Sequence, residues 1–378
     1  MKHYDVIVAG LGAAGSATVQ QLARRGVAVL GLDRYTPPHG LGSSHGKTRI
    51  IREAYWENPL YVPFVHRAYE CWSDLERESG RTLFAPTGGL MIGPGDGPLV
   101  RGAIRSAREH DLPHEVLSAV EVHRRFPGLI PRMDMVGVWE PRAGVLFPEQ
   151  AIETQLMLAT RAGAELRFDE PLTGWRQAGE SIEVTTPSGT YAAGRLILAA
   201  GAWMKRLLPE LDLPLTVERT VIYWFRPERP TGHFSPDRFP VFLFEITPDN
   251  LWYGFPDMGE GVKAALHHQG EAAEAETVRR VVGPEEVARI RAILQVFMPD
   301  ADGPLVDSAV CMYTNTPDRD FLIDFHPSNP AVLIASPCSG HGFKFSSAIG
   351  EILADLAITG RSRFDLSPFR LDRFVSAT

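Results

Sequence analysis

The chain has 378 residues, of which 44% are hydrophobic and 22% charged, an ordinary balance for a globular protein of about two domains. Its formal net charge of −8 opposes binding to nucleic acid or to an anionic membrane, and its longest strongly apolar run, residues 196–204, is too short to cross a bilayer. Three widely spaced cysteines and the lack of an apolar leader before the first glycines favour a reduced, cytoplasmic protein without a disulfide framework.

The N-terminal segment has the pattern of a βαβ unit. The apolar run 4–9 (YDVIVA) predicts a buried strand, a helical pattern follows, and a second apolar run, 27–32, ends at Asp33. The turn between the first strand and the helix reads Gly10-Leu11-Gly12-Ala13-Ala14-Gly15. Its first two glycines allow a tight turn close to a pyrophosphate, the third lets helix and strand pack, and Asp33 can accept hydrogen bonds from a ribose. The unit predicts a dinucleotide site, and the motif alone fits NAD or FAD.

Later segments favour a flavin protein. Residues 182–203 predict a hairpin that turns at 187–189, then a buried strand that enters Gly201, as in flavin proteins of the glutathione-reductase type. Residues 61–80 and 277–298 have helical periodicity, and aromatic-rich runs in 216–262 are typical of a mixed or antiparallel sheet.

The predicted fold class is therefore α/β, with a Rossmann-like FAD-binding domain and an inserted mixed-sheet substrate domain. We expect the discontinuous FAD-binding domain to comprise residues 1–80, 150–215 and 310–378. The substrate and catalytic domain is expected to comprise residues 81–149 and 216–309.

Unusual charges gather in a few short segments. The segment 42–55, GSSHGKTRIIREAY, holds one histidine and three cations, which repel one another unless anions lie among them. It is either an exposed basic loop or a wall that faces a flavin and an acidic substrate. Lys263 and His267 share one face of a predicted strand, and such a pair taken alone is more often on the surface than catalytic. Lys344 lies in the first turn of a predicted helix, where a cation needs an anion such as a substrate carboxylate.

Together, GLGAAGS, GSSHGKTRIIREAY, CMYTNTPDRDFLIDFHP and SGHGFKFSSAIGEILADLA resemble the monomeric sarcosine oxidase and N-methyltryptophan oxidase family, from about residue 3 to residue 374. The resemblance implies FAD attached as an 8α-S-cysteinyl thioether to Cys311, in the CMYT context. No metal is expected, because His45, His267 and His341 do not form a cluster with ligand spacing. The resemblance implies a monomer that oxidises the C–N bond of an N-methyl (secondary) amino acid such as sarcosine by hydride transfer to FAD. Oxygen would be reduced to hydrogen peroxide, and the imine would hydrolyse to amino acid and formaldehyde.

Alternatives stay open at this point. N-methyltryptophan, or cyclic amino acids related to pipecolate and proline, are other candidate substrates. A catalytically inactive dinucleotide-binding protein is the alternative from a different class. Four aromatic residues, Trp224, Phe242, Phe244 and Trp252, could line a pocket for a bulkier side chain. Cys338, in a Pro-Cys pair where the family commonly has Gly-Phe, is a second candidate for flavin attachment.

The resemblance also assigns roles to single positions. His45 and Arg49 would lie near the isoalloxazine ring, and Lys263 would promote the reaction of reduced flavin with oxygen. Arg52 and Lys344 would hold the substrate carboxylate, whereas Tyr253 and His267 would position the substrate amine. The positions that match FAD contacts are Gly10, Gly12, Ala13, Ala14, Gly15, Asp33, Arg34, Ser43, Ser44, Thr48, Arg49, Leu172, Ala200, Gly201, Trp203, Cys311, Met312, Gly340, Gly342, Phe343 and Lys344.

Overall fold

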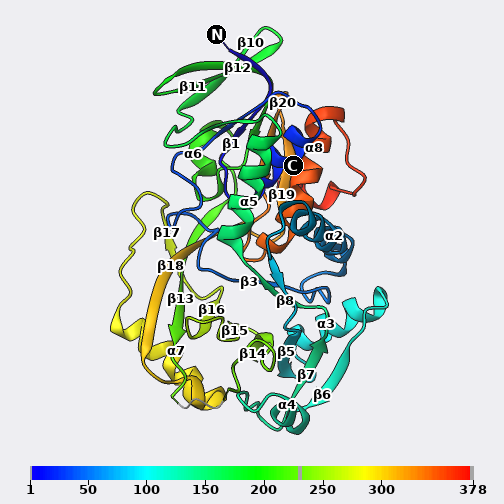
Figure 1. The fold of residues 1–378 in the computed structure, drawn as a ribbon, viewed down its shortest axis with the longest axis vertical. Coiled ribbons are helices and arrows are strands. Elements are labelled where there is room, and N and C mark those ends of the chain that lie inside the picture. Colours follow the sequence, from blue (N-terminus) through cyan, green and yellow to red (C-terminus); the bar gives the residue numbers. More distant parts are fainter. Residues whose placement is uncertain (1, 229–231, 375–378) are drawn as a thin grey trace.

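The computed structural model describes residues 2–228 and 232–374, so the outermost ends of the predicted FAD-binding domain, 1 and 375–378, lie outside the described residues. Within this part of the chain the strands form an eight-stranded, a nine-stranded and a three-stranded sheet. The eight-stranded sheet lies at the end of the molecule that carries the N-terminus, and much of the nine-stranded sheet lies at the opposite end (Figure 1). No helix among the described residues is both long and apolar enough to span a membrane.

The eight-stranded sheet has the parallel centre expected of a dinucleotide-binding domain. Its order is β10-β11-β12-β1-β2-β9, and β20 pairs with both β12 and β19. Strand β1 pairs in parallel with β12 and β2, and β12 pairs in parallel with β20, so apolar runs such as VIVA are buried on both faces. Its strands are β1 (His3–Ala9), β2 (Val29–Leu32), β9 (Glu165–Arg167), β10 (Gly174–Ala178), β11 (Ser181–Thr186), β12 (Gly189–Leu198), β19 (Leu322–His326) and β20 (Asn329–Ser336).

Helices pack against one another beside this sheet. Helix α1 (Ala13–Arg24) contacts both α5 (Pro148–Arg161) and α8 (Ser346–Thr359), and α2 (Val62–Ser79) packs on α8. The short α6 (Met204–Leu207) follows β12. The three-stranded sheet, in the order β3-β8-β4, consists of β3 (Arg49–Ile51), β4 (Phe84–Ala85) and β8 (Gly144–Leu146).

The nine-stranded sheet is mixed. Its order is β17-β13-β16-β15-β14-β5-β7-β6, and β18 pairs along β13. Only β14 and β5 pair in parallel among the pairs described. The strands are β5 (Gly89–Pro94), β6 (Glu115–Ser118), β7 (Met135–Glu140), β13 (Thr216–Phe225), β14 (Val241–Thr247), β15 (Asn250–Phe255), β16 (Val262–His267), β17 (Glu271–Ala273) and β18 (Leu305–Asn315). The accompanying helices are α3 (Pro98–Glu109), α4 (Ala119–Arg125) and α7 (Pro284–Phe297).

Most predicted elements are confirmed, and three details differ. The predicted helix at 277–298 begins only at Pro284, because Gly283 is its N-cap and Glu286 accepts the Gly283 N–H. Lys344 lies in a 3₁₀ turn, Phe343–Phe345, directly before α8. The predicted boundary at residue 310 falls inside β18, which belongs to the nine-stranded sheet through its pairing with β13. The assignment of two domains at these residues stays a prediction.

Candidate active site

One large cavity collects most of the predicted site residues. It is lined from the nucleotide side by the β1–α1 turn and from the nine-stranded sheet by Ile222, Leu243, Tyr253, Phe255 and His267. The predicted residues that line it are Gly10, Gly12, Ala13, Ala14, Asp33, Arg34, Ser43, Ser44, Arg49, Arg52, Leu172, Ala200, Gly201, Trp203, Tyr253, His267, Cys311, Met312, Gly340, Gly342, Phe343 and Lys344. Four others, Gly15, His45, Thr48 and Lys263, are absent from this lining among the described residues.

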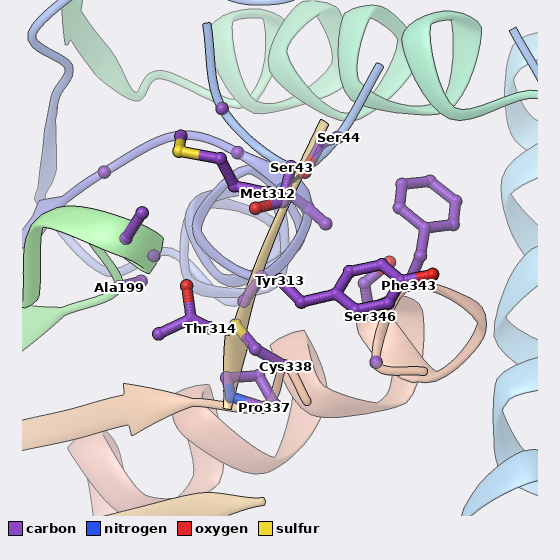
Figure 2. A pocket seen from close by; sticks show the side chains of 18 of the residues that line it. Ser43, Ser44, Ala199, Met312, Tyr313, Thr314, Pro337, Cys338, Phe343 and Ser346 are labelled. Atoms are coloured by element: carbon purple, nitrogen blue, oxygen red, sulfur yellow. Dashed lines mark hydrogen bonds between the residues drawn. The ribbon is translucent and has the colours of Figure 1, made fainter. Parts of the chain in front are cut away.

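Figure 2 shows how separate segments meet in the cavity. Met312, Tyr313 and Thr314 follow one another along β18, with Ser43 and Ser44 on one side and Pro337 and Cys338 on the other. The Thr314 carbonyl accepts the N–H of Ser339 at 2.9 Å, which ties β18 to the 337–342 turn. The wall of the cavity therefore comes from both large sheets.

The β1–α1 turn is shaped for a dinucleotide. Gly10 has φ +94°, and a Cβ there would lie 2.5 Å from the Ala199 carbonyl oxygen, while a Cβ at Gly15 would lie 1.7 Å from the Gly10 oxygen. Only glycine fits these two positions. Asp33 accepts the N–H groups of Leu11 at 2.6 Å and Tyr35 at 2.9 Å, so its carboxylate is fixed at the end of β2.

The residues present fit FAD. Gly12, the N-cap of helix α1, has no side chain, and the first turn holds no acidic residue, which suits a pyrophosphate. The Ser44 hydroxyl, on the cavity lining, accepts the Ala13 N–H at 3.2 Å. Three cavity-lining side chains also carry buried polar atoms without a hydrogen-bond partner among the described residues: Trp203 Nε1, Thr314 Oγ1 and Ser346 Oγ. Because such atoms are rarely left unpaired, they indicate that a polar ligand occupies this space.

Cys311 has the most activated thiol of the three cysteines. Its Sγ lies 3.7 Å from Arg49 Nη2 and 3.5 Å from the Ser43 carbonyl oxygen. Burial raises the pKa of this thiol, but His45 and Arg49 outweigh the burial and bring the pKa down to about 7. A substantial thiolate fraction therefore exists at neutral pH. Burial instead raises the pKa of Cys338, which also lines the cavity, and raises that of Cys71 to about 12.

Lys263 lies behind the cavity wall. Its Nζ donates to the carbonyl oxygens of Gly46 at 2.7 Å and Thr48 at 2.9 Å and to Thr48 Oγ1 at 3.0 Å, and it lies 4.5 Å from the centre of the Phe255 ring. Burial, followed by the charge of Arg49, lowers the pKa of Lys263 well below its usual value. The predicted strand position of Lys263 is confirmed in β16.

Two buried cations face the far end of the cavity. Arg52 Nη2 donates to both carboxylate oxygens of Glu57 at 2.7 Å, and Lys344 Nζ donates to the His341 carbonyl oxygen at 2.7 Å. Burial lowers the pKa of Lys344 to about 7, with Arg52 acting in the same direction and Glu57 opposing it. The sequence prediction missed Glu57, although the rule that clustered cations need anions pointed to nearby acids.

A neutral imidazole lies beside these cations. Burial lowers the pKa of His267 well below its usual value, and His268, His341, Lys344 and Arg52 act in the same direction. His267 Nδ1 lies 3.4 Å from the Tyr313 hydroxyl, and its ring centre lies 6.1 Å from that of Tyr253. Tyr313 was not predicted, but it shares a strand face with Cys311 two residues earlier, and this spacing could have identified it.

The suggested aromatic pocket is wrong. None of Trp224, Phe242, Phe244 and Trp252 lines the cavity in the described structure, and the last three pack in the core around Phe297. Side chains alternate along a strand, so β14 presents Leu243 to the cavity and turns its two phenylalanines away. These aromatics therefore give no support for a bulkier substrate.

The model of the FAD dependent oxidoreductase (DAO) family matches residues 5–356. The chain belongs to this family. Within it, the chain is 43% identical over 378 residues to monomeric sarcosine oxidase from Streptomyces avermitilis, covering 99% of this chain and 98% of the relative. It is 36% identical over 374 residues to N-methyl-L-tryptophan oxidase from Yersinia pestis, covering 98% of this chain and 99% of the relative.

Solved structures share the fold over almost the whole chain. NikD, described as an unusual amino acid oxidase essential for nikkomycin biosynthesis, superimposes with a TM-score of 0.87 at 26% identity, covering 98% of each chain. Glycine oxidase from Geobacillus kaustophilus superimposes with a TM-score of 0.81 at 21% identity, covering 99% of each chain, and shows the fold alone. The predicted family, the α/β fold class and the assignment as an FAD-dependent oxidoreductase are confirmed.

Proposed function

We propose that this DAO-family protein is an oxidase of N-methyl (secondary) amino acids such as sarcosine, with oxygen as the electron acceptor and hydrogen peroxide and formaldehyde as products. The observation that carries the proposal is the pairing, in one cavity, of a dinucleotide cradle with two buried cations, Arg52 and Lys344. The names of the relatives that are about 40% identical over the full chain support sarcosine as the substrate class. Those relatives are named monomeric, and we propose the same state here.

The two cations bind the substrate carboxylate. Arg52 offers a planar fork and Lys344 a point charge, and both side chains are almost completely buried, so their attraction for an anion is strong. Glu57 holds Arg52 when no substrate is present, and the incoming carboxylate takes over part of this pairing. A substrate without a carboxylate lacks the group that this site needs.

The surroundings of the substrate nitrogen favour its neutral form. Arg52, Lys344 and Arg49 line the same cavity, and their positive charge disfavours a bound ammonium ion. His267, held neutral by burial, and the nearby Tyr313 hydroxyl would orient the substrate amine. The amine lone pair that remains is what C–N oxidation requires.

FAD, when bound, takes up the two electrons of C–N oxidation and passes them to oxygen. The β1–α1 turn and Asp33 would hold its nucleotide half, and Cys311 would hold the flavin as an 8α thioether. Formation of such a bond would release the thiol proton and one methyl hydrogen of the flavin, and the two electrons would be taken up by the flavin and then by oxygen. The lowered pKa of the Cys311 thiol supports the assignment, because the thiolate is the reactive form.

Lys263 supports the oxygen step from behind the wall. Its three hydrogen bonds fix the amine between Gly46 and Thr48, next to Arg49, which lines the cavity. The three acceptors match the three N–H donors of an ammonium group, which offsets the lowering of the Lys263 pKa by burial. Such a positive charge in a dry site would stabilise the negative charge that develops when oxygen is reduced.

Two measurements test the proposal. The purified protein should be yellow, and the colour should stay with the polypeptide after acid precipitation. A peroxide-release screen should then give the highest kcat/KM with sarcosine or another N-methyl amino acid rather than with pipecolate, proline or N-methyltryptophan. A colourless protein, or a flavoprotein that releases no peroxide with any of these amino acids, would overturn the proposed function.

A further inference from the structure

One aromatic ring lies beneath both carboxylate-binding cations. The Arg52 guanidinium lies over the Tyr55 ring at 4.4 Å from its centre, and the Lys344 ammonium lies over the same ring at 5.3 Å. Tyr55 is fully buried and is absent from the cavity lining among the described residues. The ring therefore contacts the two cations from within the protein, behind the space that the substrate would occupy.

The orientation of this ring is fixed by His341. The Tyr55 hydroxyl oxygen lies 2.5 Å from His341 Nδ1, and His341 Nε2 lies 2.9 Å from the Arg319 carbonyl oxygen. A carbonyl can only accept, so Nε2 carries the imidazole proton, and Nδ1 accepts the proton of the Tyr55 hydroxyl. Phe345 and Tyr61 pack against the ring at centre distances of 5.2 Å and 4.9 Å. The ring has little freedom to turn.

The same turn that orients the ring also holds Lys344. The carbonyl oxygen of His341 accepts the Lys344 ammonium at 2.7 Å, and Trp72 Nε1 donates to the Lys344 carbonyl oxygen at 2.9 Å. On the other side, Arg52 Nη1 donates to the carbonyl oxygen of Ala54, the residue next to Tyr55, at 3.1 Å. Arg52 is therefore hydrogen-bonded next to Tyr55, and Lys344 is hydrogen-bonded to His341. The hydrogen bond between Tyr55 and His341 connects these two segments.

The Tyr55 ring offsets an electrostatic cost of placing two cations in this site. Two like charges in a buried site repel each other, and each loses its hydration. Glu57 offsets this cost for both cations. The other described groups that stabilise the Lys344 ammonium are the His341 carbonyl oxygen and the faces of the Tyr55 and Phe345 rings. The negative face of an aromatic ring attracts a cation without competing for the hydrogen bonds that a carboxylate needs.

We propose that Tyr55 is a positioning residue for the proposed carboxylate site: its ring, held by the packed rings of Phe345 and Tyr61 and by His341, keeps Arg52 and Lys344 in place and favours the charged form of Lys344. The inference deepens the proposed function and rests on it. It adds a group that touches neither substrate nor cofactor but sets how strongly an anion is bound.

The pH dependence of anion binding gives a readout that a purely structural role would not change. The groups that face Lys344 are Arg52, Glu57, His267, His341 and the rings of Tyr55 and Phe345. Above pH 6, His341, whose pKa is lowered to about 4, and His267 are neutral, and Glu57, whose pKa is lowered, is ionised. Among these groups Lys344 is then the one that titrates, and anion affinity falls as the pH rises through its pKa.

The test uses the flavin-loaded protein and acetate, which has the carboxylate but no amine to oxidise. Acetate binding is followed by the change in the visible absorption of the flavin between pH 6 and 9. Tyr55→Phe keeps the ring and removes the hydroxyl, and replacement of Tyr55 by 3,4,5-trifluorophenylalanine keeps the shape but removes most of the negative charge on the ring face. The same fluorinated residue at Phe369, which packs against Tyr61 in the same core, is the matched control.

We expect Tyr55→Phe to bind acetate within about threefold of the unchanged protein, and the fluorinated residue at position 55 to bind it about tenfold more weakly than phenylalanine there. The pH midpoint should also move lower with the fluorinated ring, because the Lys344 ammonium loses stabilisation. The Phe369 control should change neither quantity. Equal acetate affinities and equal pH midpoints with phenylalanine and with the fluorinated residue at position 55 would overturn the role of Tyr55 and leave the proposed function unaffected. Failure of the unchanged protein to bind acetate would instead overturn the carboxylate site, and with it the proposed function.

Discussion

Lys263→Met separates the two halves of the proposed reaction. Methionine keeps a straight, unbranched side chain in β16 but removes the amine and its three hydrogen bonds. The carbonyl oxygen of Gly46 keeps the Thr48 N–H at 2.8 Å, and that of Thr48 keeps Arg49 Nη1 at 2.8 Å. Only the Thr48 hydroxyl loses its one described side-chain partner, so we expect the free energy of unfolding to fall by about 1–3 kcal/mol.

Lys263→Met should slow the reaction of the reduced flavin with oxygen far more than it slows flavin reduction. Loss of one preorganised charge near a developing anion typically slows the step by about 10²- to 10³-fold. Reduction of the flavin by sarcosine without oxygen should slow by less than about tenfold, because the carboxylate site and His267 are unchanged. Stopped-flow absorbance measures both steps: anaerobic mixing with sarcosine for reduction, and mixing of the reduced protein with oxygenated buffer for reoxidation.

Lys47→Met is the matched control. The Lys47 ammonium lies 5.3 Å from the centre of the Trp224 ring, and that of Lys263 lies 5.4 Å from the same ring. Lys47, however, is 45% exposed and pairs with Glu260 at 2.8 Å, so water screens its charge. Its removal should change the rates of flavin reduction and of reoxidation by less than about twofold. Equal slowing of reduction and reoxidation in Lys263→Met, or equal effects of the two lysines on reoxidation, would refute the assigned role.

Three further tests address other parts of the site. Cys311→Ser should release FAD on acid precipitation and Cys338→Ser should not; colour that stays with the Cys311→Ser polypeptide would move the attachment to Cys338. In the Cys311→Ser background, Asp33→Asn should weaken FAD retention in dialysis by about tenfold, because a charged acceptor is lost from the nucleotide site; unchanged retention would remove Asp33 from that role. Leu243→Ala should raise kcat/KM for bulkier N-methyl amino acids relative to sarcosine, whereas Phe244→Ala, on the opposite face of β14, should cost about 3–5 kcal/mol of stability without changing that ratio. The same shift in ratio for both variants would contradict this division of the strand.

The predicted site was most accurate where local pattern decides the structure. The β1–α1 turn follows from glycines that no other residue can replace at those backbone angles, and Asp33 follows at the end of the next strand. The suggested aromatic pocket included Phe242 and Phe244, whereas the residue of this strand that lines the cavity is Leu243, between them. A strand buried on both faces gives no signal of which face lines a cavity.

The surroundings of several site residues depend on partners distant in the chain. Tyr55 contacts His341, and Lys263 is held by residues 46 and 48. The lowered pKa of Cys311 comes from the imidazole of His45 and the guanidinium of Arg49 against the cost of burial. These contacts depend on how the two large sheets meet, which periodicity within a single strand does not encode.

By itself, the sequence determined the dinucleotide turn with its flanking strands and helix, because backbone conformation and side-chain spacing are local properties, and its combined motifs identified the family. Only the tertiary structure decided that Lys263 lies behind the wall, that Glu57 pairs with Arg52, and that the Lys344 pKa falls to about 7. Burial and charge pairing set these properties, and both depend on which distant groups surround a side chain once the chain has folded.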